Sequence, residues 1–101
     1  MGVAELTIEL ISSIRDPEMR VNVASTINYL LDVYSSGKIN EDEIRDDLFE
    51  IVQTVFSSTM PDKTKEEITK MSKNKVDEFL RAFKMEGLLR RAVSKYRVPM
   101  P

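Results

Sequence analysis

Apolar residues recur at every third or fourth position in four stretches of this 101-residue chain, over residues 3–14, 17–36, 41–56 and 64–86. Polar and charged residues fill the intervening positions. That period matches the 3.6 residues of an α-helical turn and not the two-residue period of a strand. The spacing therefore predicts an all-α domain, a compact bundle of four to five helices with short connections.

Start and stop signals divide the stretches from one another. Asp16-Pro17 places a capping residue before a proline at a first helical position, and Gly37 is a natural helix end. Asn40 and Thr64 are each followed three residues later by a glutamate, which is typical of a capping box. Gly87 interrupts the last pattern, so residues 88–98 are expected to form either a short fifth helix or a short extended segment.

The apolar positions also predict which helix is central. The stripe over residues 17–36 is the widest, so we expect this helix to be the most buried element. Methionine and phenylalanine side chains are expected in the core, at Met60, Met71, Met85, Met100, Phe49, Phe56, Phe79 and Phe83. Phe49 lies off the centre of its stripe, and an exposed aromatic there would indicate contact with another chain.

The domain organisation is expected to be simple. Residues 1–97 are predicted to form one helical domain, and residues 98–101 a frayed Pro-Met-Pro tail. No apolar run approaches the ~20 residues that span a bilayer. The N-terminus lacks the pattern of a signal peptide. We therefore expect a cytoplasmic protein with no membrane contact.

The chain contains no histidine and no cysteine. Without cysteine it has no disulfide, no thiolate nucleophile and no Cys-based zinc site. Without histidine it lacks the commonest general base and the commonest transition-metal ligand. The composition therefore predicts a protein that is not an enzyme and that has no catalytic residues, no cofactor and no metal.

Charge divides unevenly along the chain. Residues 1–60 contain 4 basic and 11 acidic side chains, whereas residues 61–101 contain 11 basic and 6 acidic ones. Four carboxylates, which we call the acidic strip, share one helix face: Glu43, Asp46, Asp47 and Glu50. Like charges at these spacings repel one another, so something basic is expected to face the strip. It is either the basic part of the same chain or a partner, which Phe49 beside the strip would also contact.

Residues 32–43 resemble an EF-hand calcium loop. Asp32, Ser36, Gly37, Asn40 and Glu43 stand at loop positions 1, 5, 6, 9 and 12. The resemblance implies a degenerate calcium site, since Tyr34 stands where a carboxylate or amide ligand is expected at position 3. A glycine that ends one helix, followed by the capping box of the next, produces a similar sequence for structural reasons alone.

Residues 65–98 resemble the later part of a winged helix-turn-helix domain, in Lys65-Glu66-Glu67-Ile68, Ser72-Lys73-Asn74-Lys75-Val76 and Glu86-Gly87-Leu88-Leu89-Arg90-Arg91. The resemblance implies that Lys73, Asn74 and Lys75 open a DNA-recognition helix and that Tyr96-Arg97-Val98 returns from a wing. Arg90, Arg91, Lys95 and Arg97 could also contact a phosphate backbone without that motif. One uninterrupted helix over residues 64–86 is the alternative.

These observations favour a small non-catalytic interaction module or accessory subunit. It is expected to act through protein–protein contact, either with another protein or by self-association. Nucleic-acid binding through the basic C-terminal third is the alternative, and a calcium site is a minor one.

Overall fold

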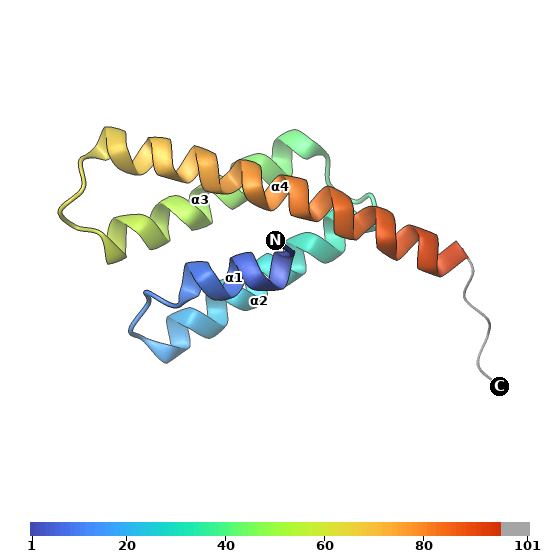
Figure 1. The fold of residues 1–101 in the computed structure, drawn as a ribbon, viewed down its shortest axis with the longest axis horizontal. Coiled ribbons are helices and arrows are strands. Elements are labelled where there is room, and N and C mark those ends of the chain that lie inside the picture. Colours follow the sequence, from blue (N-terminus) through green and yellow to red (C-terminus); the bar gives the residue numbers. More distant parts are fainter. Residues whose placement is uncertain (96–101) are drawn as a thin grey trace.

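The computed structural model describes residues 1–95, which fold into four helices: α1 (Val3–Ile11), α2 (Pro17–Ser35), α3 (Glu41–Thr59) and α4 (Lys65–Lys95). No strand occurs among these residues, so the predicted all-α bundle is confirmed (Figure 1). Within the same residues, every helix is either too short or too polar to span a lipid bilayer. The Pro-Met-Pro tail that the sequence predicts lies outside the described residues.

The helix boundaries follow the local signals. The side chain of Asp16 accepts a hydrogen bond from the backbone N–H of Glu18, and Asn40 accepts one from Glu43 at 2.8 Å. Thr64 and Glu67 form a reciprocal capping box, with both hydrogen bonds at 3.1 Å. These side chains satisfy backbone donors that lack a partner in the first turn of a helix.

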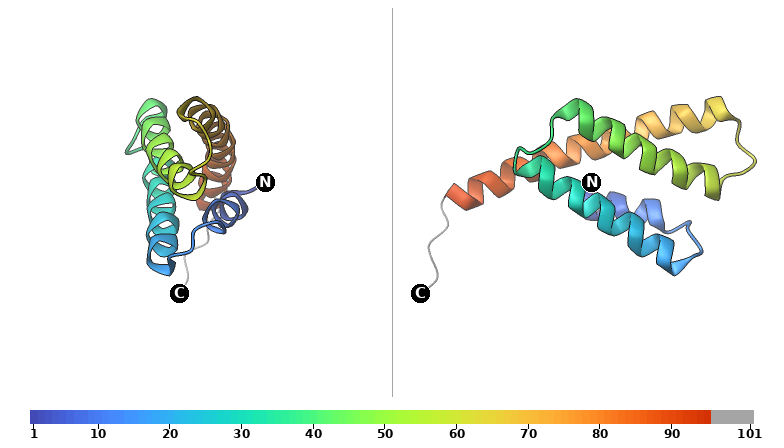
Figure 2. Two further views of the ribbon diagram at one scale, coloured as in Figure 1. Left: turned by 90° about the vertical axis from the view of Figure 1, so that its left-hand side faces the viewer. Right: turned by 180° about the vertical axis from the view of Figure 1, so that it is seen from behind.

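One turn of the chain depends on a glycine. Gly37 has a φ of +76°, in the left-handed region that other residues rarely adopt. It ends the turn after α2 and reverses the chain into α3. Figure 2 shows α2 and α3 on either side of this turn.

The helix that contributes the most buried residues and contacts all three others is α4, so the prediction that α2 is the most buried element was wrong. Only Ile27, Leu30 and Leu31 are buried on α2, whereas Val21 and Tyr29 are more than 60% exposed. Eight residues are buried on α4: Ile68, Ser72, Val76, Phe79, Leu80, Ala82, Phe83 and Gly87. A wide apolar stripe indicates how much surface a helix can bury, but its neighbours determine how much it does bury.

The last helix continues without a break from Lys65 to Lys95, so the proposed interruption at Gly87 was wrong. The helix-turn-helix alternative fails for the same reason: Lys73, Asn74 and Lys75 lie inside a helix and do not open one. Ala92 to Lys95 are helical, and the rest of the proposed wing, Tyr96–Val98, lies outside the described residues. Ser72, the one polar residue in the stripe, is fully buried in the core and does not mark a turn.

The core expectations hold with one clear exception. Phe79 and Phe83 are fully buried and meet edge to face at 6.4 Å between ring centroids, and Phe56 is also buried. Met60, Met71 and Phe49 are partly buried and pack against this core. Met85 is 62% exposed and is not a core residue. Met100 lies outside the described residues.

Candidate functional site

The last part of α4, residues 84–95, first packs against the end of α2 and then extends past the other three helices, at the right-hand end of Figure 1. Four large apolar side chains on this segment lie largely in solvent, each between 59% and 68% exposed: Met85, Leu88, Leu89 and Val93. Their spacing of i, i+3, i+4 and i+8 places them along one side of the helix. We call them the α4 stripe.

The opposite side of this segment faces the bundle. Gly87 is buried, and a Cβ atom added there would lie 3.8 Å from the hydroxyl oxygen of Ser35. One turn later, the guanidinium of Arg90 donates a hydrogen bond to Asp32 at 2.7 Å. These contacts attach α4 to the end of α2, and they leave the α4 stripe exposed, although Met85 also lines a hollow beside Leu6 of α1. Single exposed apolar residues are common, but a continuous row of them marks a contact surface.

An ion pair stands where α4 leaves the bundle. Lys84 Nζ lies 2.9 Å from Glu41 Oε1 at the start of α3. The hydrogen bond from Lys84 lowers the pKa of the Glu41 carboxyl, and the same bond raises the pKa of the lysine. Both groups are exposed, so the pair contributes little to the stability of the fold.

The predicted nucleic-acid residues fall into two separate groups. Arg90, Arg91 and Lys95 line a shallow cleft of about 520 Å³ between α2 and α4, together with Asp32 and the serines Ser35, Ser36 and Ser94. The hydroxyl oxygen of Ser35 is itself buried. Lys73 lies about 25 Å away along α4, given a rise of ~1.5 Å per residue. The structure therefore does not bring all of them together, and Arg97 lies outside the described residues.

In the group around Lys73, the side chain of Lys75 already forms two ion pairs. Its ammonium lies 3.0 Å from Glu9 and 2.8 Å from Glu78. Burial alone would lower the pKa of Lys75, but the bonds to Glu78 and Glu9 outweigh it and raise the pKa. Lys73 and Asn74 are exposed. Lys75 is thus a structural link between α1 and α4.

The acidic strip is exposed along its whole length. Within residues 1–95, none of its four carboxylates forms a salt bridge; Lys84, Arg90 and Lys75 pair with Glu41, Asp32 and Glu9 instead. The two halves of the chain therefore neutralise each other only in part. Phe49 is half-buried against the core and does not offer the exposed aromatic that its position suggested.

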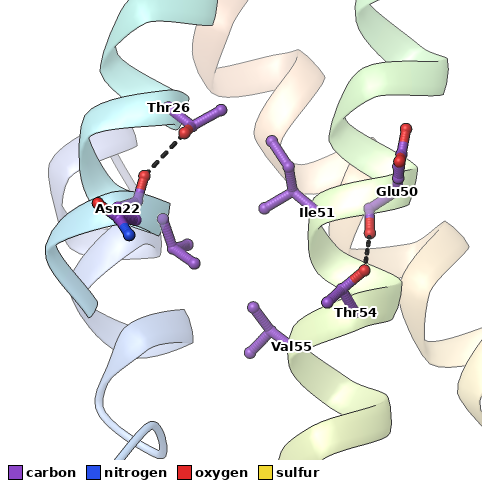
Figure 3. Close-up of a pocket in the computed structure, with 7 residues that line it drawn as sticks. Asn22, Thr26, Glu50, Ile51, Thr54 and Val55 are labelled. Carbon is purple, nitrogen blue, oxygen red and sulfur yellow. Dashed lines mark hydrogen bonds between the residues drawn. The ribbon is translucent and has the colours of Figure 1, made fainter. Parts of the chain in front are cut away.

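A shallow groove of about 240 Å³ lies between α2 and α3. Ile51 and Val55 point from α3 toward α2 across it (Figure 3). The groove is lined by apolar, uncharged polar and acidic residues: Asn22, Val23, Thr26, Glu50, Ile51, Thr54 and Val55. Glu50 of the acidic strip is thus part of the groove wall.

The EF-hand resemblance does not correspond to a cation site in this structure. Asp32 pairs with Arg90, and the ring of Tyr34 packs against Phe83 with centroids 6.0 Å apart. Among residues 1–95, no three acidic side chains are grouped so that they could hold a metal ion. Gly37 and Asn40 have the turn and capping roles described above.

Comparison with protein families, with curated proteins and with solved structures finds no significant match to this chain. The candidate site therefore depends on geometry alone. Sequence reasoning missed the α4 stripe because it assigned Met85 to the core and ended the helix at Gly87. The available signal was a change of phase: the apolar positions move to the other side of the helix between Phe83 and Met85.

Proposed function

We propose that this chain is a non-catalytic helical interaction module, and that the α4 stripe is the surface with which it contacts a protein partner. The single observation that carries the proposal is the row of four large apolar side chains, each about three-fifths exposed, on a helix end that extends from the bundle. Apolar surface of this kind gains free energy when a partner removes it from water.

The form of the surface supports a protein as the partner. Apolar side chains at i, i+3, i+4 and i+8 match the way an amphipathic helix inserts its anchors into a groove. Gly87 and Arg90 attach the helix to α2, so the stripe is already ordered before it binds. A preformed helix loses less conformational entropy on binding than a disordered segment does.

Site-specific photo-crosslinking tests the proposal. A photoreactive amino acid at position 88 should give one discrete cross-linked product, whose mass reports whether the partner is a different protein or a second copy. The matched control is position 21, where Val21 is 63% exposed on α2 and should give no such product. Equal labelling at both positions, or none at position 88, contradicts the proposal.

Nucleic-acid binding is the second candidate, because three basic residues line one cleft between α2 and α4. Arg91 and Lys95 would contact phosphates, and Arg90 would have to leave Asp32 to join them. A fluorescence titration with duplex and single-stranded DNA at two salt concentrations tests it, since affinity from phosphate contacts falls steeply as salt rises. No binding at low salt excludes it.

A further inference from the structure

We propose that the partner of the α4 stripe is a second copy of this chain, and that the stripe inserts into the groove between α2 and α3 of that copy. The inference rests on the proposed function, because it takes the α4 stripe as the contact surface. It adds the identity of the partner and the surface that receives the stripe.

The groove has the chemistry that the stripe requires. Its floor is apolar, with Val23, Ile51 and Val55, and its edges carry small uncharged side chains from both helices. Its one charged lining residue is Glu50, and no basic residue lines it. A floor of this kind accepts leucine and methionine side chains, and the volume of about 240 Å³ leaves room for a few of them.

Charge complementarity favours this receiving surface. Three carboxylates of the acidic strip lie in line with Thr54 of the groove edge, at i, i+4, i+7 and i+11 along α3: Glu43, Asp47, Glu50 and Thr54. We call these three carboxylates the acidic row. The acidic row therefore continues the groove edge toward the turn at Gly37. One flank of the stripe has the same spacing in Lys84, Leu88, Arg91 and Lys95. Arg91 and Lys95 form no salt bridge within residues 1–95, and neither does the acidic row.

The same charges disfavour the simplest alternative, in which two stripes pair with each other. Arg91 and Lys95 form no salt bridge within residues 1–95, so two copies of this segment side by side bring unpaired positive charges together and repel. An acidic groove on the second copy removes that repulsion.

The contact cannot form within one chain. The groove lies around residues 22–26 and 50–55, whereas α4 leaves the bundle at the other end (Figure 1). Each copy therefore offers a stripe at one end and a groove at the other. Such a head-to-tail contact generates either a closed ring or an open chain of copies.

The contact is expected to be weak and sensitive to salt. The stripe extends only about 12 Å along the helix, at ~1.5 Å per residue, and a standard stable interface uses roughly 20–30 residues from each partner. Salt screens the attraction between the basic flank and the acidic groove edge.

Sedimentation velocity of the purified chain over a wide concentration range tests the proposal. The average mass should rise with concentration and should fall again as salt is added. Leu89→Glu in the stripe and Thr26→Arg in the groove should each weaken association at least about tenfold, since each introduces a charge that the contact would bury. Both positions are exposed, so neither change disturbs the core.

Two matched controls keep the same chemistry away from the contact. Val21→Glu alters an exposed apolar residue, and Ser25→Arg places an arginine next to Thr26 on the outer side of α2. Both should associate like the wild type. Far-UV circular dichroism and a thermal melt of each variant confirm that it is folded.

Mixing the two defective variants separates stripe-to-groove contact from stripe-to-stripe and groove-to-groove pairing. The Thr26→Arg chain keeps an intact stripe, and the Leu89→Glu chain keeps an intact groove. Together they should form a complex of one chain of each and grow no further. Restored association of this kind supports the proposal.

The failing outcomes are distinguishable. A wild-type chain that stays monomeric, or a mixture that does not associate, overturns the head-to-tail proposal. A photo-crosslink from position 88 to a different protein does the same but leaves the stripe as a contact surface. If Leu89→Glu loses association but Thr26→Arg associates like the wild type, the stripes pair with each other and the groove is not involved. Binding of a monomeric wild type, but not Leu89→Glu, to phosphatidylserine-containing vesicles would assign the stripe to lipid and remove both proposals.

Discussion

The two parts of α4 have the same helical periodicity, but the apolar side of the first part is buried and that of the second part is exposed. Between Lys65 and Phe83 the apolar side faces α1, α2 and α3 and is buried, with Phe79 and Phe83 fully so. Between Lys84 and Lys95 the apolar side has moved roughly half a turn around the helix axis, given 3.6 residues per turn. It is now largely exposed, and small or polar residues such as Gly87 and Arg90 face α2. Amphipathicity therefore shows that a helix has a contact side, but not which molecule supplies the contact.

Matched truncations in the two parts should give the largest difference. Phe79→Ala should lower the free energy of unfolding by about 3–5 kcal/mol, because it removes a fully buried ring. Leu89→Ala should change it by less than about 0.5 kcal/mol, because most of that side chain already contacts water. Urea unfolding followed by circular dichroism measures both. Similar losses would mean that the end of α4 packs against the bundle.

Removal of the buried hydroxyl should stabilise the inner part of α4. Ser72 is fully buried, and its hydroxyl oxygen has no hydrogen-bond partner within the described residues. Ser72→Ala should raise the free energy of unfolding by about 1 kcal/mol, because an unsatisfied buried polar group destabilises the folded state by ~1–3 kcal/mol. The same urea titration gives the value. A loss of stability would show that the hydroxyl has a partner, such as a buried water molecule.

Gly87→Ala tests whether the helix really continues between the two parts. In a helix, alanine is favoured over glycine by ~0.8–1.0 kcal/mol, and the added Cβ meets Ser35 at 3.8 Å, an ordinary contact distance. The variant should therefore be more stable by about 0.5–1 kcal/mol and more helical by circular dichroism. If Gly87 instead ended a helix in the left-handed conformation, alanine would destabilise the protein.

The ion pair at the junction of the two parts should give the smallest effect, and one that depends on pH. The pKa of Glu41 lies below its usual 4.5, so its contribution to stability is present above pH 4.5 and is lost as the pH falls through the lowered pKa. The pKa of Lys84 lies above its usual 10.5, so its contribution is present below pH 10.5 and is lost as the pH rises through the raised pKa.

Melting temperatures as a function of pH measure this effect. Glu41→Gln should lower the melting temperature slightly at neutral pH and should weaken its fall in acid. Asp42→Gln is the matched control, since Asp42 is an exposed neighbour for which no salt bridge occurs within residues 1–95. If the melting temperature of Glu41→Gln falls in acid as steeply as that of the wild type, the pair does not form in solution.

Much of the fold was predictable because its signals are local. The caps at Asp16, Asn40 and Thr64 satisfy backbone groups within three residues, and the left-handed turn at Gly37 depends on one residue type. The prediction at Gly87 failed because glycine lowers helix propensity by only ~1 kcal/mol, which the rest of a long helix readily outweighs. The candidate site was harder to predict. The sequence located the basic residues near Arg90 and the acidic strip, but it assigned Met85 to the core and ended the helix before the rest of the stripe.

By itself, the sequence determined that this protein is helical, where most helices begin and end, and that histidine and cysteine chemistry is absent. Those properties depend on backbone capping, on periodicity and on composition, which act over a few residues. Only the tertiary structure decided that α4 is the central helix and that its last turns remain uncovered. Leu80 and Leu89 are both leucines of α4, but Leu80 is buried and Leu89 is exposed. The difference arises because burial is a property of neighbours that are distant along the chain.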